Sequence, residues 1–297
     1  MNRSINNREM RLVVLHEGMA GNTPLRLENL REAARGSVEF HSIDSLECNY
    51  AQLPSLGAGD MLYNAGRGSA RLETLLINSQ VATFYGRNPL YIADRHDSTL
   101  FTVVHERFAL PAPKTIHQVS TSRAALECAV ETLGGFPIIL KSIGGSMGVG
   151  TVLVESWRSL RSVVDLLQHS GMQFILREYI EPGEVCRLTV LGGQVVASNV
   201  KYIATNDFRT SVRERPVEPR TYDPSVQALA VSAAQVLDLE FGGADIILDK
   251  KGNPYLLEFN FPCDYVTSEK ACAVPIGRMM VAHLKDKAHR MLAMTPP

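Results

Sequence analysis

The sequence predicts a mixed α/β (α+β) protein in two parts. The first part alternates short apolar runs with helical segments, which is typical of strand–helix–strand units on a parallel sheet. The later part contains a β-hairpin, Gly243 to Asn260, in which two apolar runs flank a Lys-Gly-Asn turn. With 297 residues, 45% of them hydrophobic, the chain can bury a sizeable core. We expect a small α/β domain over residues 1–95 and a larger domain over residues 96–297.

Composition excludes several classes of protein. A net charge of −1 argues against nucleic acid or an anionic membrane as the main partner. The polar N-terminus does not resemble a signal peptide, and no apolar run approaches the ~20 residues of a membrane span. The cysteines are odd in number and scattered, with no CxxC pair: Cys48, Cys128, Cys186, Cys263 and Cys272. This pattern indicates reduced thiols in a cytoplasmic protein and no structural zinc site.

The first part reads as alternating strands and helices. Strands are predicted over residues 10–16, 38–43, 59–63 and 81–85, and helices over residues 23–36 and 70–78. Thr23 is the predicted N-cap of the first helix, with Pro24 at its first helical position. The Gly-containing loop after the first strand lacks GxGxxG and GxxxxGK[ST], so we interpret it as an ordinary connection or part of a substrate pocket.

The second part mixes helices with antiparallel strands. Helices are predicted over residues 98–108, 122–133, 157–168 and 225–239 and after Pro275; strands over 137–140, 151–155, 174–176, 187–191 and 194–200. Residues 178–180 are interpreted as a hinge and residues 181–184 (EPGE) as a turn. A lid subdomain over about 115–178 and a C-terminal subdomain over about 179–297 are expected.

The Gly243–Asn260 hairpin predicts a cation site. With its turn centred between Lys251 and Gly252, Asp245 faces Glu258, and alternation points Asn260 to the same side. Two acids opposed across a sheet repel, and one Mg²⁺ with oxygen ligands at about 2.0–2.1 Å would bridge them. The alternative is a solvated strand face, although the surrounding apolar residues favour burial.

Lys141 and the glycine-rich loop after it predict phosphate binding. The lysine ends an apolar strand, and Gly144, Gly145, Gly148 and Gly150 follow. Glycines let backbone N–H groups approach an anion, and the lysine supplies a compact charge. The alternative is a flexible hairpin. Further on, the polar stretch ATNDFRTSVRER is either a solvated loop or a mobile segment that brings Arg209 to a reacting phosphate.

Together these motifs resemble a known family. Lys141 with its glycine loop, the hinge EYI, the segment DFR and D-x(12)-E-x-N occur in the order seen in ATP-grasp enzymes. The resemblance covers about residues 95–290 and is closest to the ribosomal-S6-modification-like branch of carboxylate–amine ligases. It implies an ATP-grasp fold with a preceding small α/β domain.

The resemblance also implies roles for individual residues. Asp245, Glu258 and Asn260 match the Mg²⁺ ligands, with Mn²⁺ as an alternative metal. The implied catalytic residues are Lys141, Arg187 and Arg209. The implied ATP-binding residues are Lys141, Gly145, Ser146, Met147, Gly148, Gly150, Glu178, Tyr179, Ile180, Glu184 and Arg209.

Three departures from the family pattern affect these roles. Ser98 stands where the family has a further phosphate lysine. Val185 stands in place of an acid two residues before the arginine that Arg187 matches, so Glu184 is expected to take the ribose hydroxyls. The segment EFNFPCDYV replaces E-x-N-x-x-P-G beside the acceptor pocket, so we expect a different acceptor from that of the namesake enzymes.

The expected function is an ATP-dependent carboxylate–amine ligase that acts on a small molecule or peptide through an acyl-phosphate. Two alternatives stay open: a nucleotide-binding sensor or scaffold, and a kinase for hydroxyl groups. Cys263 and His16 border the expected substrate region, and structural roles are favoured for both. Homo-oligomerisation is left open.

Overall fold

The computed structural model describes residues 10–66, 69–90, 98–143, 148–203, 207–209 and 216–294. The helices are α1 (Thr23–Ala34), α2 (Ala70–Leu76), α3 (Ser98–Arg107), α4 (Arg123–Thr132), α5 (Trp157–His169), α6 (Pro224–Val236), α7 (Val266–Cys272) and α8 (Ile276–Met294), with a short 3-10 helix at Tyr50–Gln52. The strands are β1 (Arg11–His16), β2 (Glu39–Asp44), β3 (Met61–Asn64), β4 (Thr115–Ile116), β5 (Ile138–Ser142), β6 (Thr151–Val154), β7 (Phe174–Glu178), β8 (Pro182–Leu191), β9 (Gln194–Lys201), β10 (Glu218–Pro219), β11 (Phe241–Asp249) and β12 (Pro254–Asn260).

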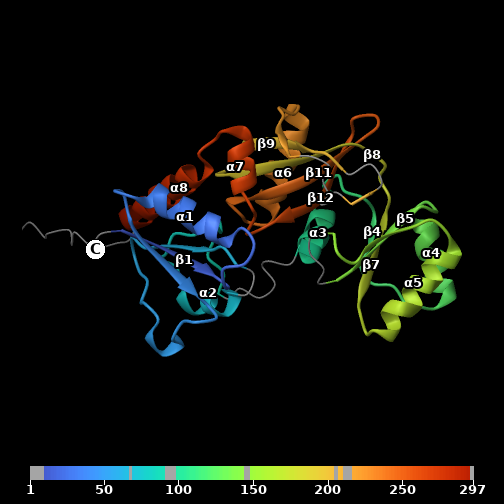
Figure 1. Cartoon of the computed structure of the whole chain (residues 1–297), viewed down its shortest axis with the longest axis horizontal. Helices are drawn as coiled ribbons and strands as arrows, with labels where there is room; N and C mark the ends of the chain where they lie inside the picture. Colours follow the sequence, from blue (N-terminus) through green and yellow to red (C-terminus); the bar gives the residue numbers. More distant parts are fainter. Residues whose placement is uncertain are drawn as a thin grey trace, which may run out of the picture.

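The strands form three sheets that follow one another along the molecule (Figure 1). A parallel sheet in the order β2-β1-β3 lies at one end with α1, α2 and α8. An antiparallel sheet in the order β10-β9-β8-β11-β12 lies in the middle. A four-stranded sheet in the order β4-β7-β5-β6 lies at the other end, with α4 and α5 on its outer face. The three sheets therefore lie one after another along the long axis of the molecule. The predicted hairpin is part of the central sheet.

The parallel sheet confirms the strand–helix pattern predicted for the first part, with two differences. Residues 81–85 are not a strand: they make isolated bridges from Ala82 to Met61 and from Tyr85 to Leu239. Part of this segment's backbone pairs with β3, and part pairs with the residues that lead into β11. There the backbone N–H of Glu240 donates to the carbonyl of Phe84 (2.7 Å). The N-cap of α1 is Asn22, and Thr23 is already helical.

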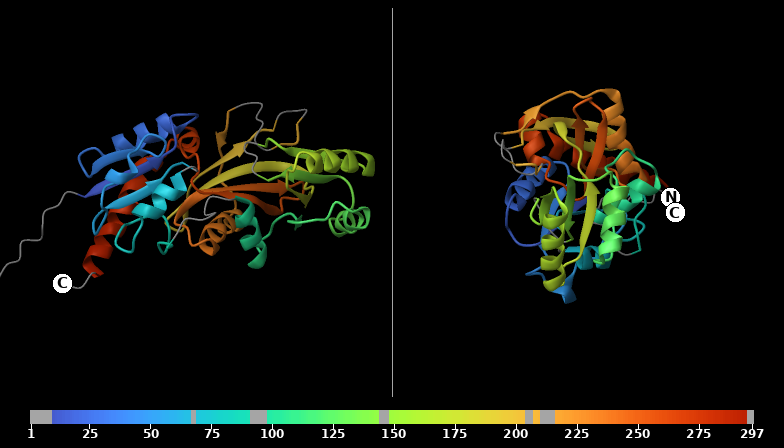
Figure 2. Two further views of the ribbon diagram at one scale, coloured as in Figure 1. Left: turned by 90° about the horizontal axis from the view of Figure 1, so that it is seen from below. Right: turned by 90° about the vertical axis from the view of Figure 1, so that its right-hand side faces the viewer.

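The central sheet has one apolar face and one face that carries charged side chains. Alternate residues of β8 and β11 belong to the main hydrophobic core together with α6: Cys186, Leu188, Val190, Ala244 and Ile246. Below this face α3 and α6 lie side by side (Figure 2). The other set of alternate residues carries the predicted site: Arg187 and Asp245 lie on that face beside the buried apolar pair Val185 and Ile247. The predicted turn at EPGE is wrong, because β8 already starts at Pro182 and a long strand absorbs the segment.

The four-stranded sheet has a core of its own. Ile138, Leu140 and Leu176 pack against α4 and α5, separately from the core shared by the other two sheets. The residues between them in β5 and β7, including Lys141, point to the opposite face, toward β12. This sheet therefore presents one face to its helices and one face to the central sheet.

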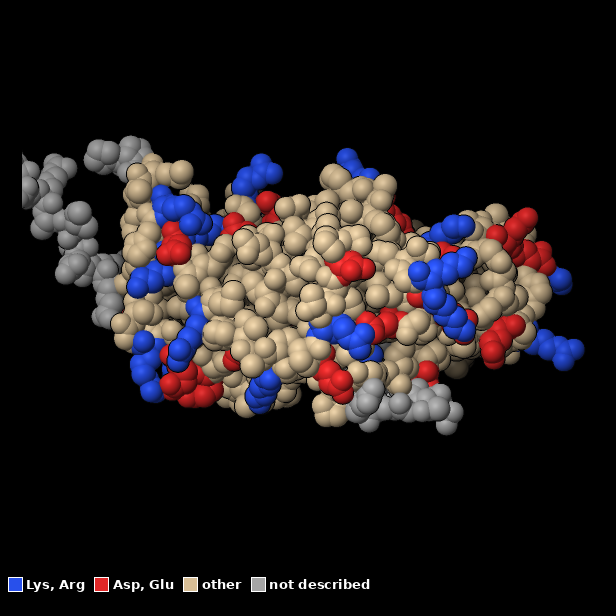
Figure 3. Space-filling model, turned by 90° about the horizontal axis from the view of Figure 1, so that it is seen from above, with Lys and Arg blue, Asp and Glu red and all other residues tan. Residues whose placement is uncertain are grey.

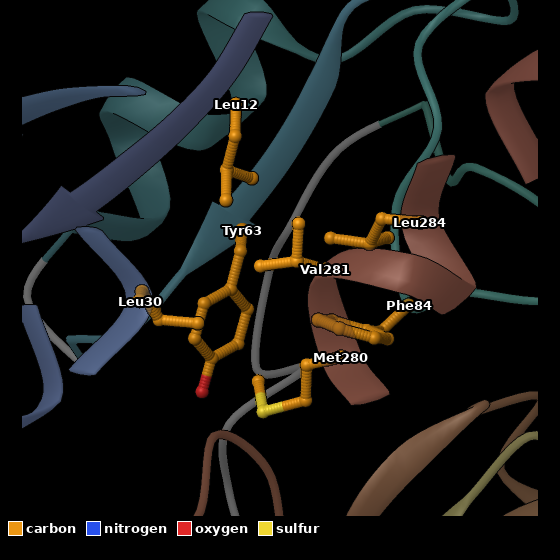
Figure 4. Close-up of a pocket in the computed structure, with 7 residues that line it drawn as sticks. All are labelled: Leu12, Leu30, Tyr63, Phe84, Met280, Val281 and Leu284. Atoms are coloured by element: carbon orange, nitrogen blue, oxygen red, sulfur yellow. The ribbon is translucent and has the colours of Figure 1, made fainter. Parts of the chain in front are cut away.

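Helix α8 returns the end of the chain to the N-terminal sheet, beside α1. Seven apolar side chains meet there: Leu12, Leu30, Tyr63, Phe84, Met280, Val281 and Leu284 (Figure 4). The gap between them is too small for a water molecule, so this seam is packed core. None of the helices in the described ranges is long and apolar enough to cross a membrane. On the face in Figure 3, acidic and basic side chains are intermingled.

Candidate active site

One face of the central sheet aligns charged side chains in one row. Asp245 of β11 lies opposite Arg187 of β8 and opposite Glu258 of β12. Arg187 lies opposite Asn199 of β9. Directly opposed residues point to the same side of a sheet, so the row is contiguous. The predicted pairing of Asp245 with Glu258 is confirmed.

A β-bulge at Leu257 is what brings Glu258 to this face. From Pro254 to Leu256, β12 pairs with residues 248 to 246 of β11; from Glu258 onward the pairing is offset by one residue. Had the first register continued, Glu258 would lie opposite Ala244, whose side chain is in the core with α6. A one-residue shift exchanges the two faces of a strand. The bulge therefore moves the Glu258 carboxylate from the core side to the Asp245 side.

The three predicted metal ligands converge. Nδ2 of Asn260 lies 3.4 Å from Asp245 Oδ2 and 3.1 Å from Glu258 Oε1. Turning the amide by half a rotation would put its oxygen in the place of the nitrogen. Two carboxylates and an amide oxygen so placed would suit Mg²⁺, which holds oxygen ligands at about 2.0–2.1 Å in octahedral geometry. The described ranges contain no cluster of three His, Cys, Asp or Glu arranged for a metal. The donor set fits Mg²⁺.

The second oxygen of Asp245 is held by two cations. Nζ of Lys201 donates to Asp245 Oδ1, and Nε of Arg187 lies 3.1 Å from the same oxygen. Lys201 and Asp245 are both buried. Burial opposes the charge on Arg187, but the nearby Asp245 carboxylate keeps the pKa of the guanidinium above its usual value. Asp245 is therefore held by two cations through Oδ1, with Oδ2 directed to Asn260.

Lys201 was missed by the sequence reasoning. It ends β9, two residues after Asn199, and therefore lies on the same face as Arg187 and Asp245. The alternation of β9 contained this signal, since Asn199 and Lys201 are polar residues on either side of the apolar Val200.

Lys141 joins the four-stranded sheet to this cluster. It lies in β5, and its Nζ is 3.5 Å from Glu258 Oε2 across the space between the two sheets. Both side chains are partly exposed, at 26% and 30%. A ligand between the sheets would thus meet the lysine on one side and the carboxylates on the other.

The glycine-rich loop after Lys141 lies partly outside the described residues, including Gly145, Ser146 and Met147. Gly148 and Gly150 close a turn at φ values of +77° and +80°. A Cβ on Gly150 would lie 1.9 Å from Oγ of Ser142, so glycine is required there. The turn is held to β5, because Ser142 N–H donates to the Gly150 carbonyl (2.9 Å).

The predicted hinge lies between the sheets. Glu178 ends β7, and its Oε2 accepts from the backbone N–H of Lys114 (3.1 Å). Its own N–H donates to the Lys114 carbonyl (2.9 Å). Tyr179 and Ile180 follow, half-buried, and burial raises the pKa of the tyrosine. The carboxylate of Glu178 thus supports the segment rather than facing the cluster.

Two predicted residues are not brought to the cluster. Glu184 is three residues from Arg187 in β8 and therefore points to the opposite face, where its Oε2 pairs with Arg220 Nη1 at 2.8 Å. Glu184 therefore lies apart from the Asp245 cluster, and its predicted contact with the ribose hydroxyls stays a prediction. Arg209 pairs with its neighbour Asp207 at 2.6 Å. The side chain of Ser98 lies outside the described part of the chain.

The segment after Asn260 runs along the N-terminal sheet. Asp264 Oδ2 accepts from Asn22 Nδ2 at 2.7 Å, ahead of α1. Cys263 is 2% exposed, and burial raises the pKa of its thiol to about 12, which makes it inert. His16 is buried at the end of β1, with Nδ1 3.0 Å from the Gly18 carbonyl. The burial of Cys263 and the backbone contact of His16 agree with the structural roles expected for them from the sequence.

Sequence comparison relates the chain to known ligases. The pattern of the RimK-like ATP-grasp domain matches residues 103–284. A probable alpha-L-glutamate ligase of Aeromonas salmonicida is 27% identical over 253 residues, covering 82% of this chain and 80% of that protein. The ribosomal protein bS6–L-glutamate ligase of Salmonella paratyphi B is 30% identical over 162 residues, covering 54% of each chain.

Solved structures share the fold. The ATP-grasp ligase PsnB with a minimal precursor superposes with a TM-score of 0.67 at 17% identity, covering 97% of this chain and 100% of that one. D-alanine–D-alanine ligase from Bacillus anthracis gives a TM-score of 0.66 at 15% identity, covering 95% and 98%. The family pattern covers more than half of the chain and includes every predicted metal ligand. The chain therefore belongs to the RimK-like ATP-grasp family and is an ATP-grasp ligase.

Proposed function

We propose that this ligase activates a carboxylate as an acyl-phosphate and joins it to an amine on a small molecule or peptide, releasing ADP and phosphate. The observation that carries the proposal is the convergence of Asp245, Glu258 and Asn260 within 3.4 Å on one face of the central sheet. The named relatives attach glutamate or act on peptides and amino acids, which supports a carboxylate–amine reaction.

The charge balance around the cluster supports a polyanionic substrate. Lys141, Arg187 and Lys201 surround two carboxylates. The cluster is thus one positive charge in excess before a divalent cation is added. Mg²⁺ would be held by Asp245, Glu258 and Asn260, and it would neutralise negative charge on the phosphates of ATP.

The chain's own residues supply the rest of the chemistry. A substrate carboxylate oxygen bonds to the γ-phosphorus, and the bond to the bridging oxygen of ADP breaks. The amine then bonds to the acyl carbon, the C–O bond to phosphate breaks, and the amine proton leaves to solvent. Lys141 and Arg187 hold the phosphate oxygens and the developing oxyanion in place. Lys201 keeps the Asp245 carboxylate oriented throughout.

The segments that flank the cluster complete the site. The hinge at Glu178–Ile180 receives the adenine, and the loop through Gly148 and Gly150 covers the triphosphate. Closure matters because water would otherwise hydrolyse the acyl-phosphate. Arg209 joins the reacting phosphate only after it exchanges Asp207 for the nucleotide, so we assign it a role in the closed state. Glu184 is not part of this proposal, because it points away from the cluster.

The test is a phosphate-release screen of amino acids and short peptides, supplied as pairs of acid and amine with ATP and Mg²⁺. The ligase proposal requires ADP and phosphate only when both substrates are present, with an amide product of the summed mass less water. Glu258→Ala should abolish turnover and leave the circular dichroism spectrum unchanged.

Other products would overturn the proposal. ADP with a stable phosphorylated hydroxyl compound identifies a kinase. Nucleotide binding without turnover for any pair identifies a sensor. Full activity of Glu258→Ala removes the metal assignment.

A further inference from the structure

Arg177 of β7 lies on the face of the four-stranded sheet that meets the active site. It is opposite Ile139 of β5 and Thr115 of β4, and Ile139 shares a face with Lys141 two residues away. Arg177 and Lys141 are therefore diagonal neighbours on the same surface. Lys141 reaches Glu258 from this surface, and Arg177 reaches the residue just before it.

The guanidinium of Arg177 is fixed by two hydrogen bonds. Nε donates to Oγ1 of Thr115 (3.0 Å), and Nη1 donates to the backbone carbonyl of Leu257 (3.1 Å). No carboxylate lies within ion-pair distance of Arg177 in the described ranges of the chain. Burial lowers the pKa of the guanidinium, against the attraction of Glu258. Burying a charged guanidinium without an ion-pair partner costs free energy. We therefore infer that Arg177 has a role other than forming a surface ion pair.

The carbonyl that Arg177 contacts belongs to the bulged residue. Leu257 has no partner on β11, and β12 is the edge strand of its sheet. A bulge leaves its extra residue outside the ladder, so the Leu257 carbonyl depends on another donor. The Leu257–Glu258 peptide directly precedes the carboxylate that the bulge turns toward Asp245.

We propose that Arg177 is a positioning residue for Glu258: by holding the Leu257 carbonyl, it fixes the β12 bulge that presents the Glu258 carboxylate to the cation site. Through Arg177, the four-stranded sheet then fixes the position of Glu258, a proposed metal ligand on the central sheet. The part of this inference that concerns cation binding rests on the proposed function; the part that concerns the bulge does not.

The first test needs no ligand. Hydrogen–deuterium exchange of the metal-free protein is followed for peptides that span β12, in wild type, Arg177→Met and Arg177→Lys. Arg177→Met keeps the length of the stem and removes every donor, so exchange at β12 should accelerate tenfold or more. Arg177→Lys retains one donor and should give a smaller acceleration. Arg123→Met, which removes an exposed arginine of α4 paired with Glu127, is the control and should leave β12 unchanged.

The second test measures cation affinity with Mn²⁺ as the probe, by electron paramagnetic resonance on the protein–ADP complex. Arg177→Met should weaken Mn²⁺ binding tenfold or more. In a Glu258→Gln background the same change should alter Mn²⁺ affinity less than twofold, because a residue that acts through Glu258 has nothing left to position. Thr115→Val, which removes the anchor of Nε, should shift affinity in the same direction by a smaller factor.

Unchanged β12 exchange in Arg177→Met overturns the inference, as does an equal loss of Mn²⁺ affinity with and without Glu258. If Arg177→Met does not fold, Thr115→Val and Arg177→Lys decide: normal exchange at β12 in both overturns it. Failure of the proposed function looks different. Wild type would then not bind Mn²⁺ with ADP, or Glu258→Gln would not weaken it, while the exchange experiment would still report on the bulge.

Discussion

Lys201 shows how a single buried side chain fixes the state of the active site. It donates to the same Asp245 oxygen that Arg187 contacts. A buried carboxylate is costly without such partners. The two cations therefore stabilise the Asp245 carboxylate in its position on the sheet.

We expect Lys201→Met to lower ATP turnover about a hundredfold or more, comparable with the loss of one preorganised donor to a transition state. Unfolding in urea should show a loss of about 1–3 kcal/mol, less than for an unpaired buried charge because Arg187 still contacts Asp245. Lys201→Arg should restore part of the stability. Lys114→Met, which changes an exposed lysine just before β4, is the control; an equal loss of turnover in it would contradict the assignment.

Glu73 is a buried acid that the proposed chemistry does not use. It is 2% exposed in α2, and Asn64 Nδ2 donates to its Oε2 at 2.6 Å. Burial raises the pKa of Glu73 to about 7, although the hydrogen bond from Asn64 opposes the shift. The Glu73 carboxyl group thus stays protonated in the folded protein over a pH range in which it is already ionised in the unfolded chain.

Stability should therefore fall as pH rises from about 4.5 to about 7 and level off above that, by up to about 3 kcal/mol from this group. Glu73→Gln cannot ionise, so its free energy of unfolding should exceed that of wild type at pH 8 and approach it at pH 5. Urea denaturation at both pH values measures the difference. Glu127→Gln, an exposed change in α4 that leaves Glu73 in place, should keep the pH dependence of wild type; the same pH profile in Glu73→Gln as in wild type would refute the linkage.

The elements of the site differ in how far the sequence predicts them. The hairpin is predictable because apolar runs and a Lys-Gly-Asn turn are local signals. The predicted turn centre between Lys251 and Gly252 is wrong, because Leu248 pairs with Pro254 and so centres the hairpin on Lys251; the predicted Asp245–Glu258 pairing is restored only by the bulge. The bulge itself is not predictable, because its cause is tertiary: Leu257 is held by Arg177, which is distant in sequence. In the burial pattern of β12, the bulge shows as two adjacent half-buried residues, Leu257 and Glu258. A strand with strict alternation would have only one half-buried residue there.

Sheet parity separates the predicted residues that lie beside Asp245 from those that point to the opposite face. Alternation along β9 predicts that Lys201 lies on the same face as Asn199. The odd spacing between Glu184 and Arg187 likewise predicts that these two side chains lie on opposite faces of β8. Residues 81–85 have the composition of a strand, but two sheets compete for their backbone groups. Arg209 lies in a polar stretch without periodicity, so sequence spacing does not give its neighbours.

Close packing of β11 on β12 makes a glycine necessary at position 242. A Cβ on Gly242 would lie 2.2 Å from the ring of Phe259 and 2.9 Å from the carbonyl of Asn260. We expect Gly242→Ala to destabilise the protein by about 1–3 kcal/mol through overpacking and to weaken Mg²⁺ binding by displacing Asn260. Thermal unfolding and a Mg²⁺ titration with ADP measure both. Gly57→Ala, with its nearest atom at 3.8 Å, is the control; unchanged Mg²⁺ affinity in Gly242→Ala would show that Asn260 tolerates the shift.

At the scale of the whole molecule, the chain folds around two cores rather than one per sheet. The N-terminal sheet and the central sheet share one core, completed by α8 at the end of the chain. Glu240 adds polar links, since it pairs with His283 (2.8 Å) and Lys287 (2.9 Å) of α8. The four-stranded sheet has a separate core with α4 and α5. The division at residues 95 and 96 stays a prediction from the sequence, and the cores suggest a different mechanical division.

We expect the four-stranded sheet with α4 and α5 to open as a unit of its own, because cooperative units follow shared cores. In native-state hydrogen exchange at increasing urea, amides of β5 and β7 should exchange at a lower common free energy than those of β1, β8 and β11. Mg²⁺ with ADP should raise the first value most, since a ligand between the sheets ties Lys141 to Glu258. Glu240→Gln is the matched control: it should lower the common value of β1 and β11 and leave β5 unchanged. A single exchange free energy for all three sheets would mean that the contacts through Lys141 and Arg177 already couple the two cores into one folding unit.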